Sequence, residues 1–396
     1  MSATATATTI SLDPLDFLNV RSLLSDEERL VQETVRNYVR DRVTPFIGAA
    51  YEAGEPLAHL PLELGELNLL GMHLEGYGCA GASAVAYGIA CMELEAGDSG
   101  VRSFCSVQGS LAMYAIWAFG SEEQKQRWLP EMAAGRAIGC FGLTEPDAGS
   151  NPAGMRTHAR RDGDDWILNG SKMWITNGSV AEIAVVWART DEGVRGFLVP
   201  AGTPGFAAPV MHGKLSLRAS ITSELTFDDV RLPADAVLPG VSSLRGPLSC
   251  LNEARYGIVW GAAGAARACY EAALDYSINR KQFDKPIAGF QLTQKKLSEM
   301  AVAVNTSTLL ALHLGRLKDQ GILRTEHVSI GKMHNVRAAL EVARSARSVL
   351  GANGITLEYP VMRHANNLES VFTYEGTDEM HTLIVGQAVT GLSAFA

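Results

Sequence analysis

The chain has 396 residues, enough for two or three packed units, and its 47% hydrophobic and 19% charged residues are typical of a soluble globular protein. The formal net charge of −9 argues against a nucleic-acid-binding surface. No apolar run approaches the ~18–20 residues that a membrane-spanning helix needs, so functions that require insertion into a bilayer are excluded.

The cysteines and the N-terminal residues indicate in which cellular compartment the protein works. The six cysteines are scattered without a CxxC pair, and no histidine cluster has metal-ligand spacing, so we expect reduced thiols and no metal. The first ten residues contain no Lys or Arg, whereas a secretory signal or a mitochondrial transit peptide needs basic residues. We therefore expect residues 1–24 to form a disordered or extended tail on a cytoplasmic, bacterial protein.

The first structured zone, residues 25–139, is predicted to be an N-terminal helical domain. Ser25 and Glu28 form a capping-box pair at its start. Four valines then recur every four residues on one helix face, and Pro45 is expected to end that helix. The valines are Val31, Val35, Val39 and Val43. Further helices are expected over 82–97, 104–119 and 121–134.

The second zone, residues 140–248, is predicted to be a β domain. Turn dipeptides follow one another at short intervals, at Asp162-Gly163, Asn169-Gly170 and Asn177-Gly178. Strand-like runs such as Trp166-Ile167-Leu168 and Met173-Trp174-Ile175 lie between them. This pattern is typical of hairpins in an antiparallel sheet.

The third zone, residues 249–396, is predicted to be a helical bundle. Its long segments rich in Ala and Leu are 249–279, 291–320, 325–350 and 378–391. Gly351 and Gly391 occupy the positions of helix C-caps. Four long helices indicate a four-helix bundle. The order helix, sheet, helix predicts an α+β fold with a central β domain.

A glycine-rich segment offers a competing interpretation. Gly76, Gly78 and Gly81 match G-x-G-x-x-G, and Asp98 lies about twenty residues further on, as in a dinucleotide-binding fold. That fold needs repeated βαβ units, and none follows this segment. We therefore interpret it as a glycine-rich loop and not as an NAD site.

Four motifs in order resemble the acyl-CoA dehydrogenase family. They are Gly142-Leu143-Thr144-Glu145-Pro146-Asp147-Ala148-Gly149-Ser150, Lys172-Met173-Trp174-Ile175-Thr176-Asn177, Arg280-Lys281-Gln282-Phe283 and Tyr374-Glu375-Gly376-Thr377. The resemblance runs from about Leu24 to Phe395. Three further segments are similar to the glutaryl-CoA dehydrogenase branch, namely Asp98 to Ser103, Leu215 to Ser220 and Asn252 to Gly257.

The resemblance implies a fold, a cofactor and an assembly. The fold is an N-terminal helical domain, a central antiparallel β domain and a C-terminal four-helix bundle, with FAD between the last two. The assembly is a homotetramer in which the adenosine end of FAD reaches a neighbouring subunit. The expected electron acceptor is an electron-transfer flavoprotein.

Glu375 is the expected catalytic base. Desaturation of an acyl thioester removes an α-proton and a β-hydride, and because no amino-acid side chain accepts a hydride, a flavin is required. The proton needs a base of tuned pKa. The resemblance assigns this role to Glu375 and gives its N–H a part in polarising the thioester carbonyl. Tyr374 and Gly376 flank it at the substrate.

The resemblance also implies the residues that hold FAD. Those near the flavin ring are Phe141, Leu143, Thr144, Trp174, Ile175 and Thr176. Those near its pyrophosphate and adenosine are Arg280, Phe283, Ser348, Gly351 and Glu379, and Gln291 and Thr377 complete the implied FAD contacts. Ser348, Ala352 and Glu379 stand where many relatives have Gln, Gly and Gln, which weakens the assignment of the adenosine contacts.

Arg102 is expected to select the substrate. A buried unpaired cation is costly in an apolar tunnel, whereas the carboxylate of a dicarboxylic acyl chain pairs with it. Ser103 adds a hydrogen bond, and Glu95 pairs with Arg102 when substrate is absent. Ser150, Asn252 and Arg255 resemble the family's contacts near the substrate and its CoA arm.

The expected activity is oxidative decarboxylation of glutaryl-CoA to crotonyl-CoA and CO2, as in lysine and tryptophan catabolism. Three alternatives remain open: a dehydrogenase for another acyl chain, a non-decarboxylating glutaryl-CoA dehydrogenase, and a catalytically silent scaffold that binds acyl-CoA and flavin. The intact Tyr374 to Thr377 motif argues against the scaffold.

Overall fold

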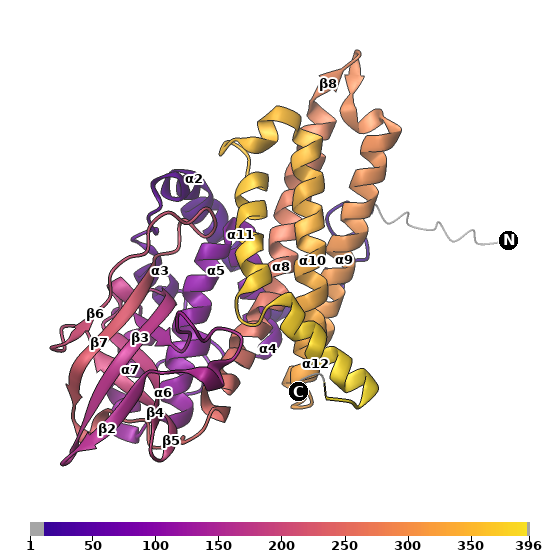
Figure 1. Cartoon of the computed structure of the whole chain (residues 1–396). Coiled ribbons are helices and arrows are strands. Elements are labelled where there is room, and N and C mark those ends of the chain that lie inside the picture. Colours follow the sequence, from indigo (N-terminus) through magenta and orange to yellow (C-terminus); the bar gives the residue numbers. More distant parts are fainter. Residues whose placement is uncertain (1–11, 394–396) are drawn as a thin grey trace.

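The computed structural model of the chain describes residues 12–393. Figure 1 shows three parts: short helices from the N-terminal third, a β-sheet beside them, and a bundle of long helices. The predicted order of helix, sheet and helix is therefore confirmed. Among the described residues, no helix is both long and apolar enough to cross a membrane.

The N-terminal part consists of seven α-helices. They are α1 (Asp26–Tyr38), α2 (Thr44–Ala53), α3 (Leu60–Glu66), α4 (Ala84–Gly97), α5 (Ser99–Ser106), α6 (Tyr114–Phe119) and α7 (Glu122–Ala133). The predicted capping box is present at the start of α1: Ser25 accepts a bond from the Glu28 N–H, and the Glu28 carboxylate accepts one from the Ser25 N–H. Val35, Val39 and Val43 are buried, as their spacing predicts.

The prediction that Pro45 ends the first helix is wrong. A π-helical segment, Val39–Val43, continues α1, and Pro45 lies in the first turn of α2. A first-turn residue needs no intrahelical N–H bond, so proline is tolerated there. Helix α2 ends at Gly54 instead, and this glycine adopts a left-handed conformation with φ 76°.

The sheet contains seven strands. They are β1 (Gly139–Gly142), β2 (His158–Asp162), β3 (Asp165–Thr176), β4 (Ile183–Thr190), β5 (Gly193–Pro200), β6 (Phe206–Ala207) and β7 (Thr222–Leu232). Their order is β1-β4-β2-β3-β7-β6, and β5 pairs with β4. Most pairs are antiparallel, as predicted, but β4 runs parallel to both β1 and β2. The sheet is therefore mixed.

One predicted turn lies inside a strand. Asn169-Gly170 belongs to β3, where the register with β7 shifts between Leu168 and Gly170. Gly170 has φ 138°, and a Cβ there would lie 2.6 Å from the Cα of Thr157. The glycine marks a bulge where two segments of the backbone approach closely, and not a hairpin turn.

The Gly76, Gly78 and Gly81 segment is a loop before α4, as interpreted from the sequence. Asp98 caps α5 by accepting a bond from the Gly100 N–H, and it forms an ion pair with Arg363. A carboxylate bound in this way is a structural group, which agrees with the rejection of an NAD site.

The C-terminal part is a bundle of four helices with a fifth helix leaving it. The bundle helices are α8 (Arg245–Asn279), α9 (Gln291–Asp319), α10 (Thr325–Leu350) and α11 (Val361–Thr373), and α12 (Asp378–Thr390) follows them. A short hairpin of β8 (Lys281–Gln282) and β9 (Lys285–Pro286) joins α8 to α9, at the top of Figure 1. All four bundle helices contribute to one buried apolar cluster.

The fourth bundle helix differs from the predicted one. The predicted segment 378–391 is α12, of which only His381 is buried. The bundle is completed by α11, which the apolar pattern does not reveal, because buried polar residues interrupt it. Arg363 and Asn367 of α11 both bond the Asp98 carboxylate, so their polarity is satisfied inside the protein.

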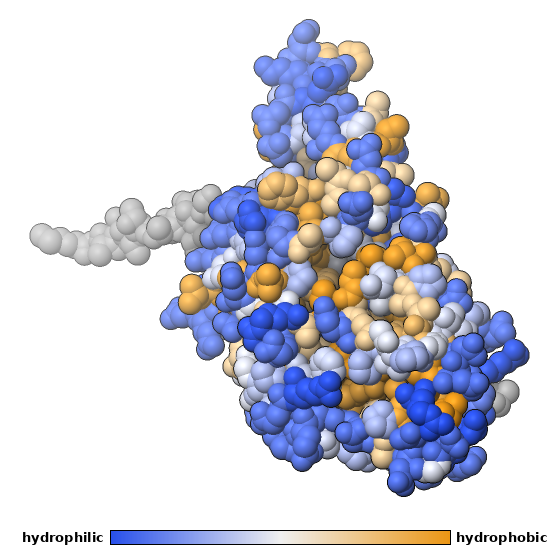
Figure 2. All heavy atoms as spheres, turned by 90° about the vertical axis from the view of Figure 1, so that its left-hand side faces the viewer, coloured by the Kyte–Doolittle hydropathy of each residue, from blue (hydrophilic) through white to orange (hydrophobic). Residues whose placement is uncertain are grey.

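The largest core lies between the N-terminal helices, the sheet and α8. Trp260 of α8 is buried against α4, where a Cβ at Gly88 would lie 2.3 Å from its indole nitrogen. Trp187 of β4 meets Phe119 of α6 edge-on. Figure 2, which faces the sheet side of the molecule, shows apolar residues gathered over the middle of this face. An apolar area of this kind is typical of surface covered by a ligand or another chain.

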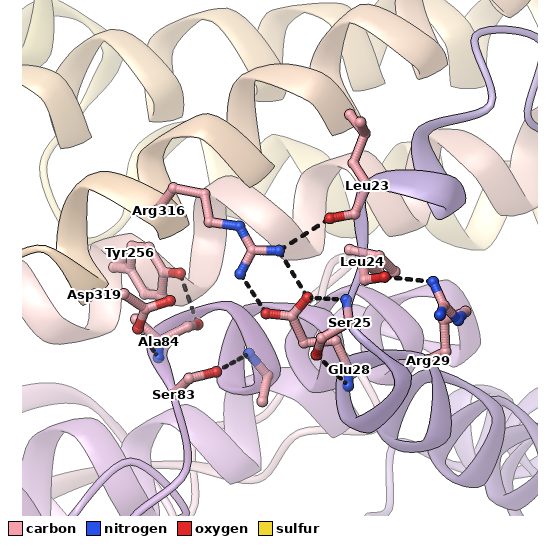
Figure 3. Close-up of polar contacts among 11 residues, drawn as sticks. Leu23, Leu24, Ser25, Glu28, Arg29, Ser83, Ala84, Tyr256, Arg316 and Asp319 are labelled. Atoms are coloured by element: carbon pink, nitrogen blue, oxygen red, sulfur yellow. Dashed lines mark hydrogen bonds and ion pairs between the residues drawn. The ribbon is translucent and has the colours of Figure 1, made fainter.

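Residues 12–24 are not the disordered tail that the sequence predicts, whereas residues 1–11 lie outside the described part. Val20–Leu23 form a 3-10 turn, and the Leu18 N–H donates to Asn305 of α9 over 3.0 Å. Figure 3 shows Arg316 of α9 bonded to the Leu23 carbonyl and the Glu28 carboxylate. The segment before α1 is thus attached to the bundle.

Candidate active site

The loop between α11 and α12 carries the Tyr374-Glu375-Gly376-Thr377 motif in an unusual backbone conformation. Glu375 has φ 55° and Gly376 has φ 90°, so both lie in the left-handed region. A non-glycine residue is conformationally strained in this region, and residues strained in this way are common at functional sites. A Cβ at Gly376 would lie 2.9 Å from the Nε2 of His381, so glycine is required.

A buried lysine and a half-buried arginine hold the carbonyls of this loop. Lys332 of α10 donates to the Tyr374 carbonyl and, over 2.5 Å, to the Gly376 carbonyl. Nε of Arg255, on α8, donates to the Glu375 carbonyl over 2.7 Å. Three successive carbonyl oxygens are therefore held by side chains of α8 and α10.

The Glu375 carboxylate has the properties of a general base. Its Oε2 atom is buried and has no hydrogen-bond partner within residues 12–393. Burial raises the pKa of this carboxyl, while Arg255, Lys332 and Arg102 act in the opposite direction. A carboxylate whose pKa is raised and whose oxygen is unpartnered is suited to accept a proton from a bound molecule.

Arg102 is almost completely buried, with only 2% of its surface exposed. Its Nε donates to Oε2 of Glu95 over 2.6 Å, so the expected pair forms. Its Nη2 donates to the Tyr374 hydroxyl, which places Arg102 beside the Glu375 motif. The second oxygen of Glu95 is buried without a partner among the described residues. Nη1 of Arg102 donates to the Ser106 hydroxyl over 3.4 Å, so the charge of Arg102 is enclosed and shared between one carboxylate and two hydroxyls.

Gly261 makes this pair possible, although sequence reasoning did not select it. A Cβ at Gly261 of α8 would lie 1.9 Å from Oε2 of Glu95 and 3.1 Å from Nε of Arg102. The helix backbone therefore forms one wall around the ion pair.

Gly261→Ala is expected to lower the free energy of unfolding by about 1–3 kcal/mol, the usual cost of overpacking a filled core. The added methyl group must displace the Glu95 carboxylate from Arg102. Gly386→Ala in α12 is the matched control, because a Cβ there meets nothing within 4 Å. Urea denaturation measures both variants, and equal losses would contradict the expectation.

The other predicted substrate residues are divided between two places. Ser103 is buried in α5 next to Arg102, and Asn252 lies near the loop, where its Oδ1 accepts a bond from Arg255 over 3.4 Å. Nδ2 of Asn252 also donates to the Thr325 hydroxyl over 3.1 Å. Ser150 is exposed in the loop after β1. The structure thus brings Glu95, Arg102, Arg255 and Tyr374 to Glu375, with Ser150 in a separate loop.

The predicted flavin-ring residues gather where β1 and β3 end. Phe141, Leu143 and Ile175 are buried, whereas Thr144 and Thr176 are half-buried. The Met173 N–H donates to the Thr144 carbonyl over 2.9 Å, which ties the two segments together. Trp174 has φ 64° and is 58% exposed, so its indole lies free at the surface of this chain. An exposed indole beside two hydroxyls suits a planar heteroaromatic ring.

A buried ion pair that sequence reasoning missed supports these strand ends. Lys172 of β3 donates to the Leu143 carbonyl over 3.1 Å and to Glu145 over 2.8 Å. Glu145 also accepts bonds from the N–H groups of Arg156 and Thr157. The residues on both sides of Thr144 are therefore held in place from inside the sheet.

The predicted pyrophosphate and adenosine residues are not brought to Trp174. Arg280, Phe283 and Gln291 lie around the β8–β9 hairpin, which Figure 1 places at the far end of the bundle from the sheet. Phe283 is 88% exposed. Gly351 follows α10 at this end too, because nearby Asn353 donates to Tyr276 of α8 over 3.1 Å.

Three more of the predicted FAD residues have other surroundings. Ser348 accepts a bond from Lys296 over 2.8 Å, and Thr377 caps α12 by accepting one from the Met380 N–H over 3.3 Å. Glu379 is exposed in the first turn of α12. Thr377 thus adjoins the Glu375 loop, while its hydroxyl already serves the helix.

Lys332 is the principal residue that sequence reasoning missed. It is 2% exposed, and burial lowers its pKa to about 7. A signal was available, since Lys332 lies four residues from both Val328 and Val336 and hence on the buried face of α10. Within residues 12–393, no group of three or more His, Cys, Asp or Glu side chains is placed to hold a metal ion.

Comparison with known proteins covers nearly the whole chain. Models of the acyl-CoA dehydrogenase N-terminal, middle and C-terminal domains match residues 25–136, 140–230 and 245–390. A crystal structure of glutaryl-CoA dehydrogenase from Mycobacterium smegmatis is 67% identical, with a TM-score of 0.96 over 98% of this chain and 100% of that chain.

Two further relatives are named for different acyl-CoA substrates. A glutaryl-CoA dehydrogenase from Mycobacterium smegmatis in complex with FADH2 is 60% identical, with a TM-score of 0.96 over 98% of this chain and 100% of that chain. The short-chain specific acyl-CoA dehydrogenase of Bos taurus mitochondria is 35% identical over 370 residues, which are 91% of this chain and 90% of that protein.

Proposed function

Because this chain belongs to the acyl-CoA dehydrogenase family, we propose that it oxidises an acyl-CoA whose chain ends in a carboxylate, with glutaryl-CoA as the substrate. The enclosed guanidinium of Arg102 carries this proposal. It lies beside the Glu375 motif, where it suits an acyl chain with a negative charge at its far end.

FAD is the cofactor, and the residues of this chain fit it. The exposed indole of Trp174 offers a face to a ring system, and the half-buried hydroxyls of Thr144 and Thr176 offer hydrogen bonds at the ends of β1 and β3. Bound FAD supplies the acceptor for the substrate's β-hydride, which no side chain can replace.

Glu375 performs the proton transfers. Its unpartnered Oε2 takes the α-proton of the thioester, and loss of the α-proton and β-hydride together leaves an enoyl thioester. With a γ-carboxylate, the enoyl product is vinylogous to a β-keto acid, so CO2 leaves and its electron pair is delocalised toward the thioester. Protonated Glu375 then returns its proton to the γ-carbon, and the product is crotonyl-CoA.

Arg102 favours a carboxylate-ended chain because of its burial. A cation 2% exposed is costly unless it is paired, and Glu95 supplies one partner in this structure. The terminal carboxylate of glutaryl-CoA offers a second, bidentate partner. An uncharged acyl chain offers none.

The far end of the bundle supports an assembly of several chains. Arg280, Phe283 and Gln291 are remote from Trp174 within one chain, so we assign them to the FAD of a neighbouring subunit in a homotetramer. The exposed phenyl ring of Phe283 and the apolar area of Figure 2 are surfaces that such contacts would cover. The proposed electron acceptor is an electron-transfer flavoprotein.

Anaerobic mixing with glutaryl-CoA, followed by mass analysis of the product, tests the proposed function. Bleaching of the flavin absorbance and formation of crotonyl-CoA with CO2 are expected. A five-carbon enoyl dicarboxylate as the only product would identify a non-decarboxylating enzyme. In a parallel experiment with butyryl-CoA, bleaching by butyryl-CoA but not by glutaryl-CoA would identify a dehydrogenase for uncharged chains. If neither thioester bleached the flavin, the protein would be a silent scaffold.

The purified protein is expected to be yellow and to contain about one FAD per chain, because each chain supplies one set of strand-end residues around Trp174. Extraction of the cofactor, chromatography and an absorbance-based ratio to protein measure this. Recovery of NAD, or failure of apoprotein to take up FAD, would contradict the cofactor assignment.

A further inference from the structure

We propose that Lys332 is a positioning residue for Glu375, because its ammonium group binds the two carbonyls on either side of that base and holds the loop in its left-handed conformation. This inference rests on the proposed role of Glu375 as the base. It adds a residue that lies 43 positions before Glu375 in the sequence, on helix α10.

The first step is the convergence of the hydrogen bonds. Lys332 donates to the carbonyl of Tyr374 and to that of Gly376, with Glu375 between them. A single ammonium group that binds both carbonyls restricts rotation of the peptides that join Tyr374 to Glu375 and Gly376 to Thr377, while Arg255 holds the carbonyl of the peptide between them. The left-handed φ values of Glu375 and Gly376 need such external support, since a non-glycine residue does not prefer this region.

The second step is the direction of the Glu375 N–H. No cis peptide bond occurs among the described residues, so this N–H points away from the Tyr374 carbonyl in the same peptide plane. That carbonyl faces Lys332 on α10, and the N–H therefore faces the opposite side. The bonds of Lys332 thus orient both the carboxylate-bearing residue and the N–H expected to polarise the thioester carbonyl.

The third step is the electrostatic setting of the carboxylate. Charged and titratable groups face Glu375 or Lys332 from each packed element: Arg102 from α5, Arg255 and Cys250 from α8, Lys332 from α10, and Asp378 and His381 from α12, with Tyr374 in the loop itself. Arg102 and Arg255 keep their charge at any accessible pH. Lys332 is a third cation below its lowered pKa of about 7, and its charge favours the ionised form of Glu375.

Removal of the Lys332 charge gives a specific signature. The rate of flavin reduction is expected to rise with pH as Glu375 loses its proton. Without the nearby cation the ionised carboxylate is less stable, so the rising limb of the pH profile moves to higher pH, by about one unit. A lysine that served only stability would lower the amount of active enzyme and leave the position of this limb unchanged.

The experiment compares holoenzymes in single-turnover flavin reduction by butyryl-CoA across pH. Butyryl-CoA is the probe because its oxidation does not depend on the glutaryl-CoA assignment. At neutral pH, flavin reduction in Lys332→Met is expected to be slower by about tenfold or more, because small displacements of a catalytic group lower the rate. The rising limb of its pH profile should also be shifted. Lys295→Met, which removes an exposed lysine on α9, is the control and should match the parent protein.

A second variant keeps the test decisive if Lys332→Met does not fold. Lys332→Gln retains hydrogen-bond donors without the charge, so it should keep more of the maximal rate and show the same shift of the limb. A pH profile of either folded variant that coincides with the parent's would overturn the role of Lys332. The assignment of the base is tested separately, because a Glu375→Gln enzyme that still reduces its flavin contradicts that assignment and not the hydrogen bonds.

Discussion

Glu375→Gln is expected to retain FAD and to bind acyl-CoA, but to reduce its flavin at least ~10²–10⁴-fold more slowly, the usual scale for loss of a general base. The amide keeps the shape of the side chain and cannot accept the α-proton. The Oε2 atom has no partner among the described residues, so the substitution breaks no hydrogen bond of that oxygen. Stopped-flow measurement of the flavin absorbance gives the rate.

The control and the pH dependence sharpen this prediction. Glu369→Gln, an exposed change on α11, should leave the rate unchanged. In the parent enzyme the rate should fall as the pH falls through the raised pKa of Glu375, because the base is then protonated. Near-normal reduction by Glu375→Gln would show that another residue removes the proton.

Arg102→Met is expected to lower kcat/KM for glutaryl-CoA by roughly 30- to 4000-fold. The substrate carboxylate would be buried without its cation, at a cost of ~2–5 kcal/mol, and each ~1.4 kcal/mol is a factor of ten. The same variant should lose little activity on butyryl-CoA, which has no terminal charge. Steady-state kinetics with both thioesters measure the ratio.

The structure requires a second variant beside Arg102→Met. Removal of Arg102 also leaves the fully buried Glu95 without its partner, and an unpaired buried carboxylate is destabilising. Arg102→Met combined with Glu95→Gln removes both charges, so it should recover any stability lost in the single variant and oxidise butyryl-CoA while glutaryl-CoA oxidation stays low. Equal losses on both substrates in the double variant would show that Arg102 is structural.

The sequence predicts the fold well, because helices and strands leave local patterns, and the motif that suggests the base is equally local. The capping box of Ser25, the helix segments and the Tyr374 to Thr377 motif are each contained in a few consecutive residues. Lys332 and Gly261 leave no such pattern, since their roles come from contacts between helices far apart in the chain. A lone lysine in a helix is usually solvated, and only the burial of its helix face distinguishes this one.

The errors have the same physical origin. Helix α11 escapes prediction because its buried Arg363 and Asn367 are satisfied by Asp98, a partner that no local pattern reveals. Asn169-Gly170 has the composition of a turn, but its glycine is needed for the approach of Thr157. Tertiary contacts override local preference in both cases.

Helix α8 has a consequence for how the molecule loses its structure. Trp260 and Val259 belong to the core shared with the N-terminal helices, whereas Ile258 and Cys269 belong to the core of the bundle. Neither core can open without exposing apolar side chains of the same helix to water. The two helical parts are therefore coupled in a single cooperative unit, and a partly melted state that keeps only one of them has little to stabilise it.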